Sequence, residues 1–405
     1  MNRVNELIKE YCPDGVEIRC LEDCCNLLDK KRKPITKAAR EAGEYPYYGA
    51  NGIQDYVANY IFDGTFVLVG EDGSVITKSG TPVVTWAEGK IWVNNHAHII
   101  EEKEGVMLRY LYHYLQTIDV TSLIHGNIPK LTGGDFKALK IAVPPLEVQR
   151  EIVHILDSFT LLTAELTAEL TARKKQYNFY RDKLLTFESD IPLLPIKEVV
   201  KKSCAGATPA KGNPEYYEDG TIPWIRTQDV RFNEITEVDS FITEKAVEET
   251  AAKWIPENCV IVAISGATAG RCAINKIKAT TNQHCLNMKI DNEKALYKYV
   301  YYCICSKQDE LISKKQGARG DLNSSLILGT KIPVPKLEIQ KKIVHVLDNF
   351  ESICSDLNIG LPAEIEARQK QYEYYRDLLL TFAETGSTLM TDRQTDRQTD
   401  RAERN

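Results

Sequence analysis

A long apolar stripe with helical spacing runs through the middle of the chain. Apolar and aromatic residues recur mostly three or four positions apart, at Ile152, Ile155, Phe159, Leu162, Leu166, Leu170, Tyr177, Tyr180, Leu184 and Phe187. This spacing is that of one face of an α-helix. It predicts a helix from about Leu146 to Phe187, starting after two prolines and about 60 Å long at roughly 1.5 Å per residue.

The stripe belongs to a segment that occurs twice. Residues 143–159, VPPLEVQREIVHILDSF, match residues 334–350, VPKLEIQKKIVHVLDNF, at an offset of 191. Residues 172–187, ARKKQYNFYRDKLLTF, match residues 367–382, ARQKQYEYYRDLLLTF, at an offset of 195. In the second copy Gly360 and Pro362 should interrupt the helix, with Pro362 in the first turn of the part that resumes.

An apolar seam of this length is not stable alone in water. We therefore expect the two copies to pair, antiparallel because a whole domain separates them; the alternative is that each copy packs only on its own domain. The scaffold or partner-binding residues predicted from the seam are Ile152, Phe159, Leu166, Leu170, Tyr177, Tyr180, Ile343, Leu347, Phe350, Tyr372 and Tyr375.

Two stretches of mixed character separate the repeats. Their strand-like runs, residues 65–70, 81–86, 90–95 and 258–265, alternate with turns, and each stretch ends in a helical segment, residues 109–116 or 298–305. VNNHAHII at 93–100 resembles TNQHCLNM at 281–288, which indicates one α+β plan used twice. The predicted divisions are a first domain at 1–142, a central helical spacer at 143–188, a second domain at 189–333, a C-terminal helical spacer at 334–384 and a tail at 385–405.

Composition narrows the functional classes. The 405 residues carry a net charge of −6, which argues against a uniformly basic surface that coats nucleic acid, although affinity depends on the face presented. The eleven cysteines include no CxxC pair suited to zinc, so we expect reduced, mostly structural thiols and no metal site. No apolar run is long enough to cross a membrane, and we expect a cytoplasmic protein without membrane contact.

Several motifs together resemble the specificity subunits of type I restriction-modification enzymes. The two helical repeats look like the conserved helices of that family. TPAKGNPEYYEDGTIPWIRTQDV, AISGATAG and TTNQH look like motifs of its target-recognition domains, as do YPYYGANGIQDY and GEDG in the first half. The resemblance covers almost the whole chain and implies two target-recognition domains separated by two long helices that form an antiparallel coiled coil.

The family resemblance also implies a function. Each domain would read one half of a split double-stranded DNA target, the helices would set the gap, and two methyltransferase subunits, with restriction subunits where present, would bind the chain. Catalysis, with S-adenosylmethionine, ATP and magnesium, would belong to those partners and this subunit would hold no cofactor. The sequence agrees, since it contains neither an amino-methyltransferase NPPY or DPPY motif nor a GxxxxGK[ST] phosphate loop.

Candidate DNA contacts follow from residue chemistry, because Arg and Lys suit guanine or phosphate and Asn and Gln suit adenine. A basic loop, whose alternative is a solvated charge run, is a candidate phosphate clamp. Matched Asn and His side chains, Asn95, His96, Asn282 and His284, suggest a scaffold role within each domain. The candidate DNA contacts are Lys30, Lys31, Arg32, Lys33, Lys37, Tyr47, Tyr48, Asn51, Gln54, Arg226, Thr227, Gln228, Arg271 and Arg319.

The tail repeats TDRQ from Thr391 and has no core-forming residues, so we expect disorder there. A four-nucleotide repeat read in triplets would encode this period, and slippage of such a tract would make expression phase-variable. Two other classes stay open at this stage. A self-contained nuclease or methyltransferase is disfavoured by the missing motifs, and a coiled-coil adaptor without DNA specificity is disfavoured by two similar but divergent domains.

A tandem TAEL repeat, Thr163 to Leu170, lies within the central helix. One further unit would lengthen a helix by about 6 Å and turn it by roughly 400°, which keeps the seam nearly in phase. We therefore predict that adding a unit widens the gap between the DNA half-targets by about one or two base pairs, at roughly 3.4 Å each. Sequencing of methylated bases in cells that carry the lengthened gene measures the gap; an unchanged gap would contradict the prediction.

Overall fold

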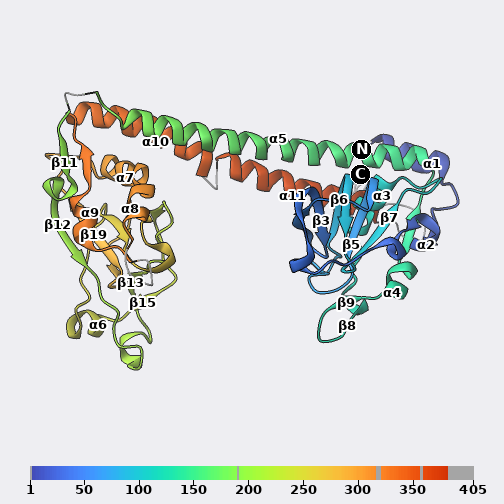
Figure 1. The fold of residues 1–405 in the computed structure, drawn as a ribbon, viewed down its shortest axis with the longest axis horizontal. Helices are drawn as coiled ribbons and strands as arrows, with labels where there is room; N and C mark the ends of the chain where they lie inside the picture. The colour runs from blue at the N-terminus through green and yellow to red at the C-terminus, as the bar shows by residue number, and fades with distance from the viewer. Residues whose placement is uncertain (1, 189–190, 316–320, 356–358, 382–405) are drawn as a thin grey trace, which may run out of the picture. The chain divides into compact units, whose positions relative to one another are not determined.

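The computed structural model describes residues 2–188, 191–315, 321–355 and 359–381 (Figure 1). It divides into two compact units: unit 1 contains the residues up to Leu166 and those from Glu364 on, and unit 2 runs from Thr167 to Ala363. Each unit is of α+β type and is described by itself. The TDRQ tail and Arg319 lie outside the described residues.

The main sheet of unit 1 has six strands, in the order β2-β7-β5-β6-β3-β4. Its central pair is antiparallel, with Val67 opposite Trp86, and its inner side chains form the core with Ile100 and Leu111. A separate antiparallel pair joins β1 (Glu17–Cys20) to β10 (Lys140–Val143). The strands of the main sheet are β2 (Asn26–Leu27), β3 (Ala42–Gly49), β4 (Gly52–Val57), β5 (Phe62–Gly70), β6 (Val84–Val93) and β7 (Ala97–Glu101).

Unit 2 repeats this plan in part. Its five-stranded sheet has the order β12-β19-β16-β17-β14, and a three-stranded sheet has the order β15-β13-β18. As in unit 1, an outer antiparallel pair, β11 (Leu193–Pro195) with β20 (Lys331–Pro333), directly precedes the scaffold helix. The sheet strands are β12 (Val200–Ala205), β13 (Ile222–Ile225), β14 (Glu234–Ile235), β15 (Phe241–Ile242), β16 (Val260–Ala263), β17 (Cys272–Asn275), β18 (Thr280–Thr281) and β19 (Cys285–Ile290).

One strand prediction was wrong in detail. Residues 81–86 and 90–95 were expected to be two strands with a turn between them, but half of the first run and most of the second belong to the single strand β6. Gly89 lies within it at φ +78 and faces Gly64 of the partner strand at φ 156. Glycine adopts such backbone angles readily, so the ladder continues through a position that looks like a turn in the sequence.

The scaffold helices follow the predicted pattern closely. The central helix α5 runs from Leu146 to Leu184. The second copy is interrupted as predicted, because α10 (Leu337–Ser355) ends before Gly360 and α11 (Leu361–Leu380) begins with Pro362 in its first turn. An N-terminal helix that was not predicted, α1 (Asn2–Tyr11), packs on the scaffold of unit 1 through Val4.

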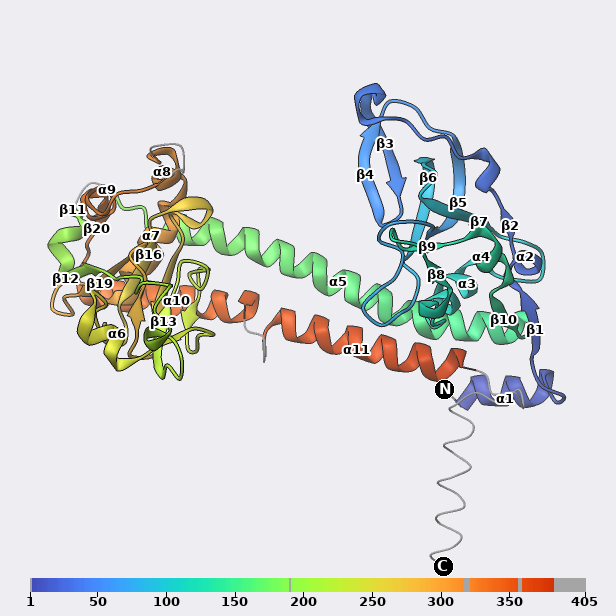
Figure 2. The ribbon, with the colours of Figure 1, turned by 90° about the horizontal axis from the view of Figure 1, so that it is seen from below.

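The two copies of the repeat pair antiparallel, as expected. In unit 1 the first half of α5 packs on α11 (Figure 2). The rings of Phe159 and Tyr375 stack there with centroids 5.2 Å apart. In unit 2 the last turns of α5 pack on α10, where Tyr180 stacks on Phe350 at 5.7 Å. Each half of the central helix therefore has its apolar seam covered by a segment from the other copy of the repeat.

A buried glutamine joins each scaffold helix to its domain. The Gln149 side chain accepts a hydrogen bond from the Met107 N–H at 2.9 Å and donates to the Pro144 carbonyl at 2.7 Å. Its counterpart Gln340 accepts from the Leu296 N–H at 2.9 Å and donates to the Pro335 carbonyl at 2.8 Å. Both side chains are fully buried, and each satisfies an N–H just before the domain helix, α3 (Leu108–Leu115) or α7 (Tyr297–Ser306).

A matched aspartate adds a charged contact in each unit. In unit 1 the Asp157 carboxylate bonds the Arg109 guanidinium at 2.7 Å and the buried His113 ring at 2.8 Å. In unit 2 the Asp348 carboxylate bonds Lys298 at 3.0 Å and the Tyr302 hydroxyl at 2.6 Å. Burial lowers the pKa of His113, although Asp157 opposes that shift.

We predict that Gln149→Leu and Gln340→Leu each destabilise their own unit. The substitution keeps a similar volume but leaves a buried N–H and carbonyl without partners, at about 1–3 kcal/mol for each group. We expect the free energy of unfolding to fall by about 3 kcal/mol. Urea unfolding measures it, with the exposed Gln369→Leu as the matched control. Equal stability of the core and control variants would contradict the role assigned to the two glutamines.

Candidate nucleic-acid interface

Three connections converge at one edge of the unit 1 sheet. Strands β3 and β6 run parallel there, with Tyr48 opposite Val93, and the Asn94 N–H donates to the Tyr48 carbonyl at 3.1 Å. The Glu71 N–H donates to the His96 carbonyl at 2.9 Å. Residues 49–51, 71–73 and 94–96 are thereby brought together, and we call this set edge 1.

The same connections converge in unit 2. Strands β13 and β18 run parallel with Ile225 opposite Thr281, and the Asn282 N–H donates to the Ile225 carbonyl at 3.0 Å. The Ile264 N–H donates to the His284 carbonyl at 2.9 Å. Residues 226–228, 264–266 and 282–284 form this set, edge 2, and its backbone bonds match those of edge 1 one for one.

An asparagine turn supports each edge. The Asn94 side chain accepts from the His96 N–H at 2.8 Å, and the Asn282 side chain accepts from the His284 N–H at 3.1 Å. The predicted scaffold role is confirmed for Asn282 and the two histidine positions. It was wrong for Asn95, because Asn94 is the buried counterpart of Asn282 while Asn95 is exposed.

The side chains on these two frames differ. Edge 1 carries the exposed Asn51 and, beside it on β4, the exposed Gln54. Edge 2 carries Arg226 and Thr227, both partly buried, and the exposed Gln228. The buried Nε atom of Arg226 has no hydrogen-bond partner among the residues that the structure describes. One backbone frame thus presents exposed amides beside the Asp72 carboxylate in unit 1 and an arginine in unit 2.

The sequence matches a family model over both units. The model is the type I restriction modification DNA specificity domain, and it matches residues 13–173 and 189–367. The chain belongs to this family. A putative type I restriction enzyme specificity subunit of Haemophilus influenzae is 35% identical over 385 residues, which cover 91% of this chain and 96% of that protein. A type I specificity subunit of Escherichia coli is 38% identical over 290 residues, covering 68% of this chain and 71% of that protein.

A solved structure agrees with the fold. The crystal structure of a type I restriction-modification S subunit from M. genitalium superposes with a TM-score of 0.57 at 14% sequence identity, and the match covers 92% of this chain and 98% of that one. This likeness concerns the fold alone, two mixed domains with long helices. Within the described ranges, no helix has the combination of length and apolar character needed to span a bilayer.

Two predicted DNA contacts of this specificity-domain protein were wrong because their side chains belong to the core. Tyr47 is 1% exposed, its hydroxyl accepts from the Ile35 N–H at 3.1 Å, and the Arg40 guanidinium lies 4.1 Å from its ring centre. Tyr48 is 7% exposed and packs with Phe62. The pairing of β3 with β4 is irregular between these two residues, and both rings are buried, so neither offers a face to a base.

The predicted basic clamp divides into two kinds of side chain. Arg32 was wrongly assigned to phosphate, because its guanidinium bonds the Glu71 carboxylate at 2.5 Å and the Ala97 carbonyl at 2.7 Å and is only 14% exposed. The four lysines of the clamp are exposed and lie on the segment around Arg32: Lys30, Lys31, Lys33 and Lys37. They form a basic surface strip that Arg32 holds against β7 and the loop after β5.

The group around Arg32 contains a set of atoms with metal-like spacing. Asp29, Glu71 and His98 place three potential ligand atoms within 4.8 Å of one another. Cations already occupy these carboxylates, since Arg32 and Lys130, at 3.2 Å, both contact Glu71. Burial opposes ionisation of Asp29, but the His98 ring and the Ile99 N–H outweigh it, and the Asp29 pKa is lowered. The arrangement is a satisfied ion-pair network.

The scaffold residues predicted from the seam are largely interior. Ile152, Ile343, Leu347 and Tyr372 are buried, and Tyr180 is the most open at 38% exposure. The other members are partly buried: Phe159, Leu166, Leu170, Tyr177, Phe350 and Tyr375.

Two further predictions concern single residue types. Arg271, predicted on the loop after β16, is partly exposed. All eleven cysteines fall in the described ranges and are free thiols, as expected.

Some site residues that were not predicted lie inside the quoted sequence motifs. Gln283, in TTNQH, is an exposed member of edge 2 and bonds the Thr208 hydroxyl. Asp72, in GEDG, bonds the His96 ring at edge 1. Gln149 and Gln340 occupy one position of the two repeated blocks, and that coincidence was the signal that could have identified them.

We predict that Arg32→Gln damages folding of unit 1 before it affects any DNA affinity. The variant leaves Asp29 and Glu71 buried without their shared cation, which costs roughly 2 to 5 kcal/mol. The matched control is the exposed neighbour Lys31→Gln, for which we expect a change within about 0.5 kcal/mol. Thermal or urea unfolding of the two variants compares them directly, and a stable Arg32→Gln protein with weakened DNA binding would restore the clamp assignment.

Proposed function

We propose that this chain is the sequence-reading subunit of a type I restriction-modification complex and that it recognises a bipartite double-stranded DNA target. Residues 1–142 would read one half and residues 189–333 the other. The helical segments 143–188 and 334–384 would hold the two readers apart. The observation that carries the proposal is the pair of edges: the same backbone frame in both units, with different polar side chains mounted on it.

Such a pair suits recognition because base identity is read by side-chain donors and acceptors, whereas backbone contacts only fix position. Asn51 and Gln54 at edge 1 match the hydrogen-bonding pattern of adenine. Arg226, Thr227 and Gln228 at edge 2 include one cation suited to guanine or phosphate, and Arg271 lies on the following loop. The exposed lysines, Lys30, Lys31, Lys33 and Lys37, would bind the DNA backbone, and Arg319 remains a candidate contact.

The chain would act without chemistry of its own. Two methyltransferase subunits would bind the scaffold helices, and restriction subunits would join the complex where they are present. S-adenosylmethionine, ATP and magnesium would be bound by those partners. Relatives described as type I restriction enzyme specificity subunits support this assignment, since the match to the Haemophilus influenzae protein covers 96% of its length.

Mapping methylated adenines in cells with the gene intact and deleted tests the proposal. We expect a split motif that disappears on deletion. Arg226→Ala should relax or abolish only one half of that motif and Gln54→Ala only the other, since loss of one base contact costs about 1–3 kcal/mol. Lys31→Ala should weaken both halves together, because a phosphate contact carries no sequence information.

Separate outcomes decide between the readings. An unchanged methylation map, with the chain and a methyltransferase subunit both confirmed as expressed, would favour an adaptor without DNA specificity. A split motif that both variants weaken evenly would keep the function and reject the assignment of one edge to each half. Methylation by the purified chain alone would reject the non-catalytic role.

A further inference from the structure

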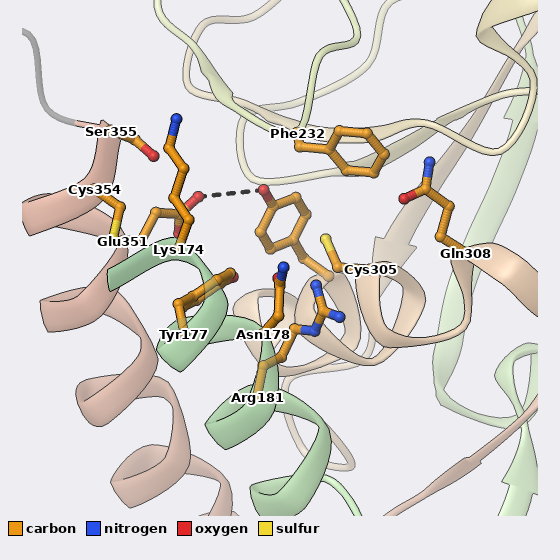
Figure 3. Close-up of a pocket in the computed structure, with 11 residues that line it drawn as sticks. Lys174, Tyr177, Asn178, Arg181, Phe232, Cys305, Gln308, Glu351, Cys354 and Ser355 are labelled. Atoms are coloured by element: carbon orange, nitrogen blue, oxygen red, sulfur yellow. Dashed lines mark hydrogen bonds between the residues drawn. The ribbon is translucent and has the colours of Figure 1, made fainter. Parts of the chain in front are cut away.

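Unit 2 contains a cavity of about 270 Å³ between the scaffold and the recognition domain. Figure 3 shows Tyr177 and Arg181 rising from α5, Glu351 on α10, and Phe232 on the opposite side. Helix α7 contributes Tyr301 and Cys305, and the remaining lining residues are Lys174, Asn178, Gln308, Cys354 and Ser355. Aromatic, cationic and amide groups therefore surround one space.

The matched place in unit 1 is occupied differently. There Tyr372, the counterpart of Tyr177, bonds the His113 ring through its hydroxyl at 2.9 Å. In unit 2 the residue at the His113 position is Tyr302, whose hydroxyl bonds carboxylates on α10. Cys305 also stands where unit 1 has the larger and polar Gln116.

Glu351, whose counterpart in unit 1 is Thr160, shares a hydroxyl with a second carboxyl. The Tyr302 hydroxyl lies 2.6 Å from Asp348 and 2.7 Å from Glu351, but it has only one hydrogen to donate. A hydrogen on one of the two carboxyls would satisfy the second contact. Lys298 binds Asp348 at 3.0 Å, which favours Glu351 as the carboxyl that carries this hydrogen.

The surroundings of Glu351 agree with this assignment. Burial raises the pKa of Glu351 and the nearby Asp348 raises it too, and together they outweigh the lowering by the Tyr302 and Tyr301 hydroxyls and by Lys298. Lys298 also forms an ion pair with Glu234 at 3.1 Å, so the ammonium group lies between other carboxylates and is not directed at Glu351. The other polar groups that line the cavity near Glu351 come from α7 and α5: Tyr301, whose hydroxyl donates to it at 3.4 Å, Cys305, Lys174, Tyr177 and Arg181.

With Glu351 neutral, the charged groups that line the cavity are the cations Lys174 and Arg181. The partner of Arg181 is Asp182 at 2.8 Å, a carboxylate that is 55% exposed and therefore bound weakly. Phe232 closes the other side from a left-handed backbone conformation at φ 60, which is rare for a residue with a bulky side chain and is concentrated at ligand sites. Cations, hydroxyl and amide donors and an aromatic wall together suit a phosphate attached to a flat base.

We propose that this cavity binds the phosphate group of a nucleotide, with Arg181 and Lys174 as its cations and Phe232 against its base. Two sources share that chemistry: a free nucleoside phosphate and a nucleotide in the backbone of bound DNA. The site goes beyond the proposed reading of bases at the edges, and its lining is specific to unit 2 because Thr160 and Gln116 take the places of Glu351 and Cys305 in unit 1.

Equilibrium dialysis of the full chain with radiolabelled ATP, with inorganic phosphate as competitor, tests the free-ligand source. Arg181→Gln should weaken binding at least tenfold and Lys174→Gln severalfold. Arg376→Gln is the matched control, since Arg376 holds the same repeat position in unit 1, is 14% exposed and pairs with Asp377 at 2.8 Å. Lys174 is exposed, so its variant keeps the test valid should Arg181→Gln fold poorly.

The pH dependence provides a second readout. Glu351 has a raised pKa, so it is neutral below that pKa and becomes an anion that repels phosphate as the pH rises through it. Wild-type binding should therefore weaken from mildly acidic to mildly alkaline buffer more than binding to Glu351→Gln, which stays neutral throughout. Comparing the two proteins cancels the titration of the ligand itself.

A duplex arm tests the other source. If Arg181 holds a DNA phosphate, Arg181→Gln should reduce the slope of log affinity against log salt by about one, and Arg376→Gln should leave it unchanged. ATP binding that follows the variants identifies a free nucleotide, and a slope change without ATP binding identifies the DNA backbone. The site would be overturned if ATP did not bind and the salt slope did not change, or if the Arg181 and Arg376 variants lost binding equally. ATP binding without any duplex binding would keep the site and reject the proposed function.

Discussion

The structure depends on covering one apolar stripe along the central helix. An isolated helix with such a seam would expose Ile152, Leu156 and their successors to water, at roughly 25 cal/mol for each square ångström of apolar surface. Segments of the second repeat copy cover it: α11 packs on the first half of α5 within unit 1, and α10 packs on its last turns within unit 2. Because each unit borrows a helical segment from the other copy, neither recognition domain is complete without sequence from both halves of the chain.

The contacts of Gln149 and Gln340 between scaffold and domain are the same in both units, whereas the side chains proposed to read the DNA target differ. Gln149 and Gln340 satisfy the same backbone N–H and carbonyl groups, and both are fully buried, so substitution at either position is costly. The edges, by contrast, hold their shape through main-chain bonds and the matched side chains of Asn94 and Asn282, which leaves the other side chains on them free to vary. This separation allows Asn51 in unit 1 and Gln228 in unit 2 to differ without disturbing the fold.

The same repeat explains where the two units diverge chemically. Two positions that line the cavity of unit 2, Cys305 and Glu351, hold Gln116 and Thr160 in unit 1. In unit 2 the Tyr302 hydroxyl lies between two carboxyls, Asp348 and Glu351. The two units share the repeated backbone, and a few side chains at the junction of scaffold and domain give that junction a different set of charged groups in each unit.

The sequence by itself determined the repeat, the helix bounds, the break before Pro362 and the two-domain plan. These features follow from local periodicity and backbone restriction, which are present in any short window of the chain. Tertiary structure decided which polar residues are available. Tyr47 and Arg32 look like DNA contacts in the sequence, yet one is core and the other an internal ion pair, because partners 12 and 39 residues away bind them. Burial and pairing of this kind are properties of long-range contacts, so no local pattern could separate Arg32 from the exposed lysines beside it.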